Sequence, residues 1–177
     1  MAWKHNRGVI VAVMAGLVVG ACDSAVMYKG DGKFIDNGIF AAKDRYVLDL
    51  GALPLSKNGS RSYEIGNLPA ESFVVGLELI GAPNVSLDSR PFNPMVAFEL
   101  TDGGGKVLMR RKSPLKEWTW SVPSTNEWAF IYGEGAQDTF FKPVPGSSFR
   151  LSVEVTNADP ATEPYTSRLV AKAGGWK

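Results

Sequence analysis

The two side chains best suited to nucleophilic and metal chemistry, a thiol and an imidazole, each occur once in the 177 residues, as Cys22 and His5. With a single thiol the chain forms no internal disulfide, and a Cys/His zinc site needs several such ligands. Catalysis of the Ser-His-Asp or Cys-His type would depend on His5 alone. The sequence therefore predicts no disulfide, no metal centre built from Cys and His ligands, and no cofactor.

Carboxylates leave two kinds of chemistry open. Glycoside hydrolysis needs a pair of acids in a cleft, and calcium binds carboxylate and carbonyl oxygens at sandwich loops. The acids available for a hydrolytic pair are Asp102, Glu117, Glu127, Glu134, Asp138 and Glu154, and those available for a calcium loop are Asp31, Asp36, Asp88 and Asp102. They lie in turns or on alternate strand positions, without EF-hand spacing, which is typical of solvated residues. We expect that the protein is not an enzyme.

The first 22 residues have the layout of an export signal. Residues 1–7 carry three basic or imidazole side chains and no acid, and residues 8–20 are 13 apolar or small residues in a row. A transmembrane helix needs about 20 apolar residues, whereas a cleavable signal peptide has a core of about 7 to 15. Cys22 follows directly after Val19, Gly20 and Ala21. This arrangement resembles the lipobox of bacterial lipoproteins.

The resemblance implies that residues 1–21 are removed and that Cys22 is lipidated on its sulfur and acylated, for example by palmitate, on its new amino group. Cys22 would then be an anchor rather than a nucleophile, and two or three acyl chains give stable attachment. Asp23 resembles the retention signal of enterobacterial inner-membrane lipoproteins. It favours the periplasmic face of the inner membrane and leaves the outer membrane open. The alternative is an uncleaved signal anchor in which Cys22 has no role.

The composition of the remaining chain indicates one folded domain that does not bind nucleic acid. Removal of Lys4 and Arg7 with the signal leaves 17 basic groups against 18 acidic ones, a net charge of −1. Nucleic-acid-binding proteins concentrate an excess of Lys and Arg on one face. Residues 22–33, which are polar and contain glycine, are expected to form the lipidated cysteine and a flexible tether. Residues 34–177 are expected to form the domain.

Period-two alternation of apolar and polar residues recurs through this domain, and no helical period of useful length appears. We therefore expect an all-β fold, a two-sheet antiparallel β-sandwich of jelly-roll or immunoglobulin-like type whose strand order stays open. The segment from Phe92 to Asp159 resembles, in outline, jelly-roll carbohydrate-binding and galactose-binding-like modules. Strands are expected at 45–50, 62–65, 73–80, 95–101, 106–111, 117–122, 127–132, 148–157 and 167–172.

Aromatic residues of this domain have two interpretations, as core between the sheets or as a binding groove that stacks on a sugar or a partner's apolar side chain. Exposure decides between them. Residues two apart on a strand share a face, so Trp118 and Trp120 should be both buried or both exposed, and the adjacent Phe140 and Phe141 should point to opposite sides. The candidate contact residues are Trp118, Trp120, Trp128, Phe140 and Phe141.

A basic run that includes Arg110, Arg111 and Lys112 lies after the predicted hairpin turn at 102–105. It either protects a solvated edge strand from aggregation or forms a patch for anionic headgroups, glycan or an acidic partner. These three residues are further candidates for ligand or partner contact.

These observations predict a bacterial lipoprotein of the cell envelope, attached to the membrane through Cys22. It would act as a non-enzymatic binding or protein-interaction module, with an unknown envelope protein or glycan as its partner. A carbohydrate- or peptidoglycan-binding β-sandwich is the first alternative. A glycoside hydrolase-like enzyme is the second.

Overall fold

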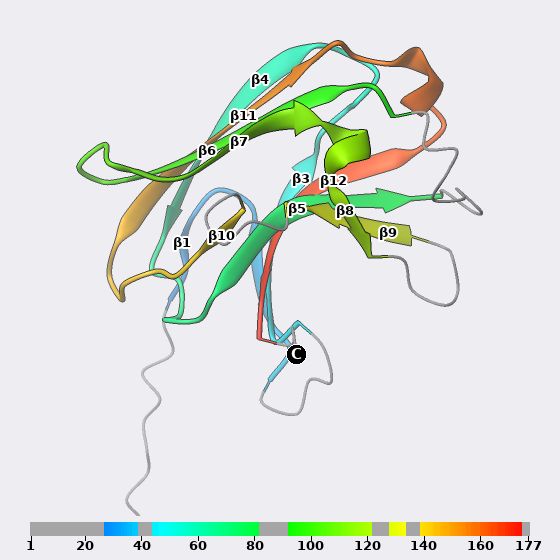
Figure 1. Ribbon diagram of the computed structural model, residues 1–177. Coiled ribbons are helices and arrows are strands. Elements are labelled where there is room, and N and C mark those ends of the chain that lie inside the picture. The colour runs from blue at the N-terminus through cyan, green and yellow to red at the C-terminus, as the bar shows by residue number, and fades with distance from the viewer. Residues whose placement is uncertain (1–26, 39–43, 82–91, 122–127, 134–138, 175–177) are drawn as a thin grey trace, which may run out of the picture.

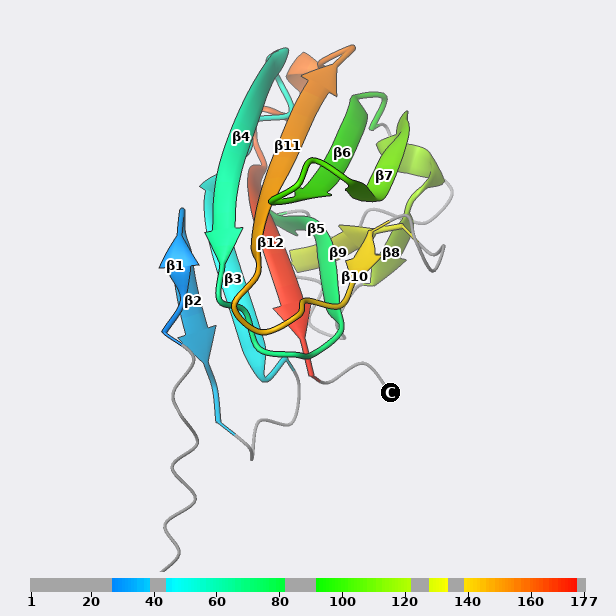
Figure 2. The same cartoon turned by 90° about the vertical axis from the view of Figure 1, so that its left-hand side faces the viewer.

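The computed structural model describes residues 27–38, 44–81, 92–121, 128–133 and 139–174. They form a two-sheet antiparallel β-sandwich, which confirms the predicted fold class (Figures 1 and 2). The five-stranded sheet has the order β1 (Lys29–Gly30), β4 (Gly59–Gly66), β11 (Ser148–Thr156), β6 (Met95–Asp102) and β7 (Val107–Pro114).

The second sheet has seven strands, six of them in the order β2 (Lys33–Asp36), β3 (Tyr46–Ala52), β12 (Thr166–Ala173), β5 (Phe73–Ile80), β9 (Trp128–Tyr132) and β8 (Thr119–Ser121). The seventh, β10 (Phe140–Phe141), also pairs with β5. Two short 3₁₀ helices, η1 (Leu115–Glu117) and η2 (Pro160–Thr162), connect strands at one end of the sandwich. All strand pairs are antiparallel.

The core lies between the two sheets and follows the period-two pattern of the sequence. In β11, Phe149, Leu151, Val153 and Val155 are buried, and the residues between them are exposed or half-buried. Each such strand contributes its apolar face to the interior and leaves its polar face in water. Buried apolar area contributes about 25 cal/mol per Å², so this shared layer is the main source of stability.

The predicted hairpin at 95–111 is confirmed, with β6 and β7 joined by a turn at 103–106. Asp102 organises the turn because its Oδ1 accepts hydrogen bonds from the backbone N–H groups of Gly104 and Lys106, both at 2.9 Å. Gly105 takes a positive φ of 82°, the conformation that the glycine-rich sequence led us to expect.

The prediction that a flexible tether extends as far as residue 33 is wrong at its carboxyl end. Lys29 and Gly30 pair with β4, and β2 begins at Lys33, so this segment crosses from the edge of one sheet to the edge of the other. Its glycines are not flexible spacers. A Cβ on Gly30, whose φ is +139°, would lie 2.2 Å from the Glu64 carbonyl oxygen. The prediction failed because composition does not distinguish a flexible glycine from one required by close backbone contact.

Aromatic stacking fixes the same segment against the core. The ring of Tyr28 stacks on Phe34 at a centroid distance of 5.5 Å, and Phe34 stacks on Tyr46 at 5.7 Å. The Tyr28 hydroxyl donates to the carbonyl oxygen of Asp31. Burial, assisted by the Asp31 carboxylate, raises the pKa of Tyr28 to about 12. The segment from Tyr28 onward therefore packs against the sandwich and does not behave as a flexible tether.

Candidate binding surface

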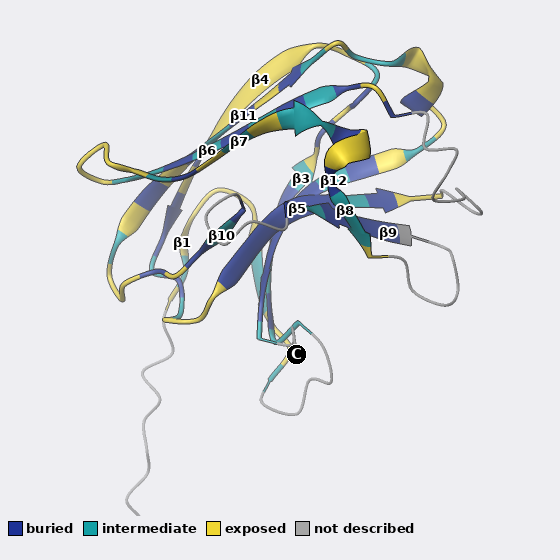
Figure 3. Ribbon diagram, viewed as in Figure 1, coloured by how far each residue is buried: buried dark blue, intermediate teal, exposed yellow. Residues whose placement is uncertain are grey.

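The outer side of the five-stranded sheet is a polar face, formed by alternate residues of β4, β11, β6 and β7. Cross-strand neighbours in the register place serine, threonine and paired charges in rows across the sheet. The exposed strands β4 and β7 are visible in Figure 3. The side chains of this polar face include Ser60, Ser62, Glu64, Arg150, Ser152, Glu154, Glu99, Thr101, Arg110 and Lys112.

Three ion pairs tie the rows of the polar face together. The nitrogen-to-oxygen distances are 2.7 Å for Arg150–Glu64, 2.5 Å for Arg110–Glu99 and 3.8 Å for Lys112–Glu154. The six side chains are between 39% and 65% exposed. Exposed pairs of this kind contribute only about 0–1 kcal/mol each, so a partner could replace them at little cost to the fold.

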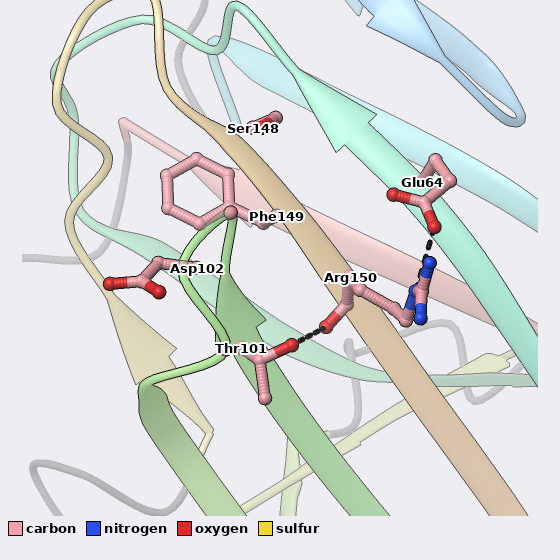
Figure 4. A pocket seen from close by; sticks show the side chains of 8 residues that line it. Glu64, Thr101, Asp102, Ser148, Phe149 and Arg150 are labelled. Atoms are coloured by element: carbon pink, nitrogen blue, oxygen red, sulfur yellow. Dashed lines mark hydrogen bonds and ion pairs between the residues drawn. The ribbon is translucent and has the colours of Figure 1, made fainter.

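A hollow of about 290 Å³ opens on the polar face beside the β6–β7 turn (Figure 4). The Arg150 guanidinium points toward Glu64 on one side of it, and Asp102 lies on the other side. Glycine keeps the hollow open, because a Cβ on Gly103 would lie 2.9 Å from the Ser148 hydroxyl oxygen. The lining is Glu64, Thr101, Asp102, Gly103, Gly105, Ser148, Phe149 and Arg150.

A second hollow, of about 390 Å³, lies on the other side of Glu64 and Ser148, which line both. It extends to Lys29 and Gly30 at the sheet edge and to Asn67 and Gly146 at the turns. Carboxylate, guanidinium and hydroxyl groups suit hydrogen bonding to a small hydroxyl-rich molecule. No exposed aromatic ring lines either hollow in the described residues, so a stacking platform for a sugar ring is not part of them.

The candidate cations of β7 divide between two sides of the strand. Arg110 and Lys112 belong to the polar face, whereas Arg111 lies over the Trp118 ring, with its guanidinium carbon 5.1 Å from the ring centroid. Arg111 also donates to the Ser113 hydroxyl and the Glu117 carbonyl. Of these three cations, only Arg110 and Lys112 therefore lie on the polar face.

The candidate tryptophans Trp118 and Trp120 both pack against the core, as core residues of a sandwich would. Trp118 is 2% exposed, meets Phe98 edge to face at 5.1 Å and donates its indole N–H to the Ser113 carbonyl. Trp120 is half-buried, stacks on Phe92 at 5.1 Å and donates to the Leu115 carbonyl. The strand expected at 117–122 starts later in the structure. Glu117 belongs to η1, Trp118 follows it, and β8 begins at Thr119. The side chain of Trp128 lies outside the described residues.

Phe140 and Phe141 point to opposite sides of β10, as predicted. Phe141 is 7% exposed and packs between the sheets on Phe73 and Phe149, each at 5.7 Å. Phe140 lies on the outer side of the seven-stranded sheet, where its ring meets Tyr132 edge to face at 6.2 Å. Of the pair, only Phe140 is open in part to a ligand.

Sequence reasoning missed the most unusual charge of the molecule, Lys172 on β12. Its side chain is 5% exposed, lies 4.8 Å from the Phe130 ring centroid and reaches Glu78 at 2.7 Å and Asp44 at 3.2 Å. This lysine belongs to an aromatic face on the outer side of the seven-stranded sheet, formed by Val74, Phe130, Val170, Tyr132 and Phe140. The sequence could have indicated this position. Lys172 lies between the core residues Ala171 and Ala173 on one strand, so its side chain must point to the outer side of the sheet.

The acids considered for catalysis or calcium have structural roles where they are described. Asp31 accepts the Glu64 backbone N–H at 2.8 Å, Asp36 accepts that of Gly38 at 2.7 Å, and Asp102 holds the hairpin turn. Glu117 lies in η1 and Glu154 pairs with Lys112. Among the described residues, no cluster of three or more His, Cys, Asp or Glu side chains could hold a metal ion. Cys22, Asp88, Glu127, Glu134 and Asp138 lie outside those residues.

Comparison with known proteins supplies no family. No protein-family model matches the chain, and no curated protein matches it. Among solved structures, the chain is similar to the VP2 subviral particle of infectious bursal disease virus, with 12% sequence identity and a TM-score of 0.19. The match covers 93% of this chain and 42% of that chain. A structure of the Gx strain of the same virus matches with 13% sequence identity and a TM-score of 0.19. That match covers 96% of this chain and 43% of the viral chain. The chain spans less than half the length of both. In the residues described, no helix is long and apolar enough to cross a bilayer.

Proposed function

We propose that the protein is a lipid-anchored bacterial envelope protein that is not an enzyme and that binds a protein partner along the edge strand β7, through Arg110 and Lys112. The observation that carries the proposal is the eight-residue edge strand β7, which bears two exposed cations. In the described residues, the other strands paired on one side only are β1, β2, β8 and β10, with two, four, three and two residues.

An edge strand can accept one more strand from a partner, because the backbone groups on its outer side have no ladder to join. In the part of the chain that the structure describes, β7 pairs with β6 on one side and with no strand on the other. Its register shifts at Leu100 and Thr101, which places a bulge beside the turn and leaves the remainder of β7 regularly paired. An added strand would therefore lie along residues 109–114.

Charge indicates the chemistry of that partner. Residues 106–117 contain five cations and one acid, and Arg110 and Lys112 are 65% and 57% exposed. An extended segment with acidic side chains at alternate positions would meet both cations on the same side of the sheet. The same cations repel basic strands and disfavour uncharged ones, and so protect the edge from unselective pairing. An acidic strand is the partner whose charge complements this edge.

The anchor supports a function in the cell envelope. Lipidation of Cys22 would hold the domain at the membrane, and Asp23 favours the periplasmic face of the inner membrane. A partner would then be another envelope protein that carries an acidic extended segment.

A second candidate is a glycan, such as a peptidoglycan fragment, in the hollow beside the β6–β7 turn. The observation that favours it is the meeting of Arg150, Glu64 and the Thr101 and Ser148 side chains around 290 Å³ of open space. Planar polar side chains and hydroxyl groups are suited to sugar hydroxyls. The two candidates use different arginines, Arg110 for the protein partner and Arg150 for the glycan.

Crosslinking in native membranes separates the two functions. We expect wild-type protein to capture a discrete partner, and the double variant Arg110→Glu/Lys112→Glu to lose at least about tenfold of that product, since charge reversal opposes an acidic strand. Arg150→Glu is the matched control, equally exposed and on the same face, and should retain the partner.

The opposite pattern favours the glycan. If Arg150→Glu abolishes retention of the protein on cell-wall material, while the double variant binds like wild type and no protein is captured, then the edge-strand proposal is wrong.

A further inference from the structure

The first described residue of the domain and the turn before β11 are held together by one asparagine. Asn67 donates its side-chain amide to the Met27 carbonyl at 3.2 Å and its backbone N–H to the Ser147 carbonyl at 3.1 Å. Asn67 adopts a positive φ of 53°, which asparagine tolerates better than most residues. The Asn67 end of the sandwich, defined by Met27, Asn67 and the turn at 144–147, is therefore one structural unit.

The turn at this end presents an aliphatic side chain to solvent. Ser147 N–H donates to the Val144 carbonyl at 3.0 Å, and Gly146 at the third position has a φ of +79°. Proline at the second position and glycine at the third are the residues of a type II turn. Val144 is 67% exposed and Met27 is 78% exposed, the highest values among the large apolar residues that the structure describes.

The distance to Cys22 limits where this end can be. Five Cα-to-Cα steps separate Cys22 from Met27, and a fully extended chain covers about 3.3–3.6 Å per residue. Met27 therefore lies within about 18 Å of the Cys22 Cα, whatever the conformation of the residues between them. A headgroup region is itself several ångströms thick, so a lipidated Cys22 leaves the Asn67 end little freedom to turn away from the membrane.

We infer that the Asn67 end rests on the bilayer, with Val144 and Met27 at the level of the headgroups. This inference rests on the proposed lipid anchor. The exposed Lys29 and Lys142 flank the two apolar side chains and suit anionic phospholipid headgroups. Small apolar side chains add modest affinity, but on a protein that is already anchored they fix its orientation.

The orientation has a consequence for the binding surface. The pairs Gly66–Ser148 and Phe149–Asp102 place the β6–β7 turn at the Asn67 end, so β7 starts beside the bilayer at Val107 and runs away from it to Pro114 (Figure 1). A partner strand paired with β7 would then extend from the membrane surface outward. Such a segment fits a partner that is itself anchored in the same membrane.

Single-cysteine labelling tests the orientation on the whole lipidated protein. Acylated Cys22 has no free thiol, and the chain has no other cysteine, so a Val144→Cys variant carries one reactive site for a fluorophore. The matched control is Ile80→Cys, 38% exposed at the far end of β5, which begins at Phe73 opposite Phe141. Both are reconstituted in phosphatidylethanolamine and phosphatidylglycerol vesicles that contain a lipid with a nitroxide headgroup.

The label at position 144 should be quenched at least about threefold more strongly than the label at position 80, because a nitroxide quenches only at short range from the headgroup layer. Equal quenching at both positions, in protein that sediments with the vesicles, overturns the orientation and leaves the anchor intact. If the purified protein does not sediment with the vesicles, the anchor itself is wrong and the orientation falls with it.

Discussion

A Lys172→Met variant should lose about 3 kcal/mol of unfolding free energy, the largest effect we expect from removing one charge in this protein. Lys172 is 5% exposed and bridges Glu78 and Asp44, whose side chains are 21% and 23% exposed. Methionine keeps the length and the apolar stem of the side chain but removes the ammonium. Two partly buried carboxylates would then face each other without a counter-charge, beside the Phe130 ring.

Urea unfolding at neutral pH measures this loss, and Lys112→Met is its matched control. Lys112 is 57% exposed and lies 3.8 Å from Glu154, so its replacement should change stability by less than about 1 kcal/mol. Addition of Asp44→Asn and Glu78→Gln to Lys172→Met should recover part of the loss, because neutral amides do not repel each other. Equal stability of the two methionine variants would show that the Lys172 cluster contributes nothing to the fold.

Replacement of Gly30 by alanine should cost about 3 kcal/mol, from steric overlap and an unfavourable backbone conformation together. The new Cβ would lie 2.2 Å from the Glu64 carbonyl oxygen and 3.0 Å from its carbon, both in the backbone of β4. Neither atom can move without breaking the pairing of β1 with β4. We therefore expect the segment at 27–32 to detach from the sheet before the remainder unfolds.

Thermal unfolding gives the stability change, and amide exchange at Glu64, whose N–H donates to the Asp31 carboxylate, shows whether β1 has detached. Gly105→Ala is the control, since Gly105 has a positive φ of 82° but no atom within 4 Å of the added Cβ. That variant should lose only about 1 kcal/mol, from the conformation alone. If the two alanine variants lose the same amount, the contact with Glu64 is not what requires glycine at position 30.

The strands that sequence alone predicted well are those with one face in the core. β5 was predicted at its observed bounds, and β6 and β11 to within one residue at each end, because alternation of apolar and polar residues is strong where one side of a strand is buried. The two-residue strands β1 and β10 have no such pattern. Their pairing is imposed by neighbouring strands and, for β1, by glycines that permit close contact.

The aromatic faces could be predicted only in part. The rule of alternation correctly separated Phe140 from Phe141, but it could not assign which side was the core. On β9 the core residue is Ile131, and the larger Phe130 packs on the outer side over Gly76, where a Cβ would lie 2.6 Å from the Phe130 ring. A glycine in mid-strand leaves room for such a ring at Gly76, but glycines in strands also mark bulges and close backbone contacts, so the sequence alone did not identify it.

The candidate surface was predicted from charge and not from shape. The basic run correctly located the edge strand, and the structure divides it into Arg110 and Lys112 on the polar face and Arg111 on the Trp118 ring. Arg110 pairs with Glu99 on β6, the neighbouring strand of the same hairpin, whereas Lys112 pairs with Glu154 on β11, which is far away in sequence. Such pairing depends on strand order, which a single sequence does not contain.

Intact-mass analysis of the protein purified from its native membrane tests the central claim, attachment through Cys22, most directly. We predict a mass equal to residues 22–177 plus a diacylglyceryl group and an amide-linked acyl chain, and a Cys22→Ser variant that lacks these groups and leaves the detergent phase. An unmodified Cys22, or a Cys22→Ser protein that still partitions into detergent, would contradict the lipid anchor and the envelope function built on it.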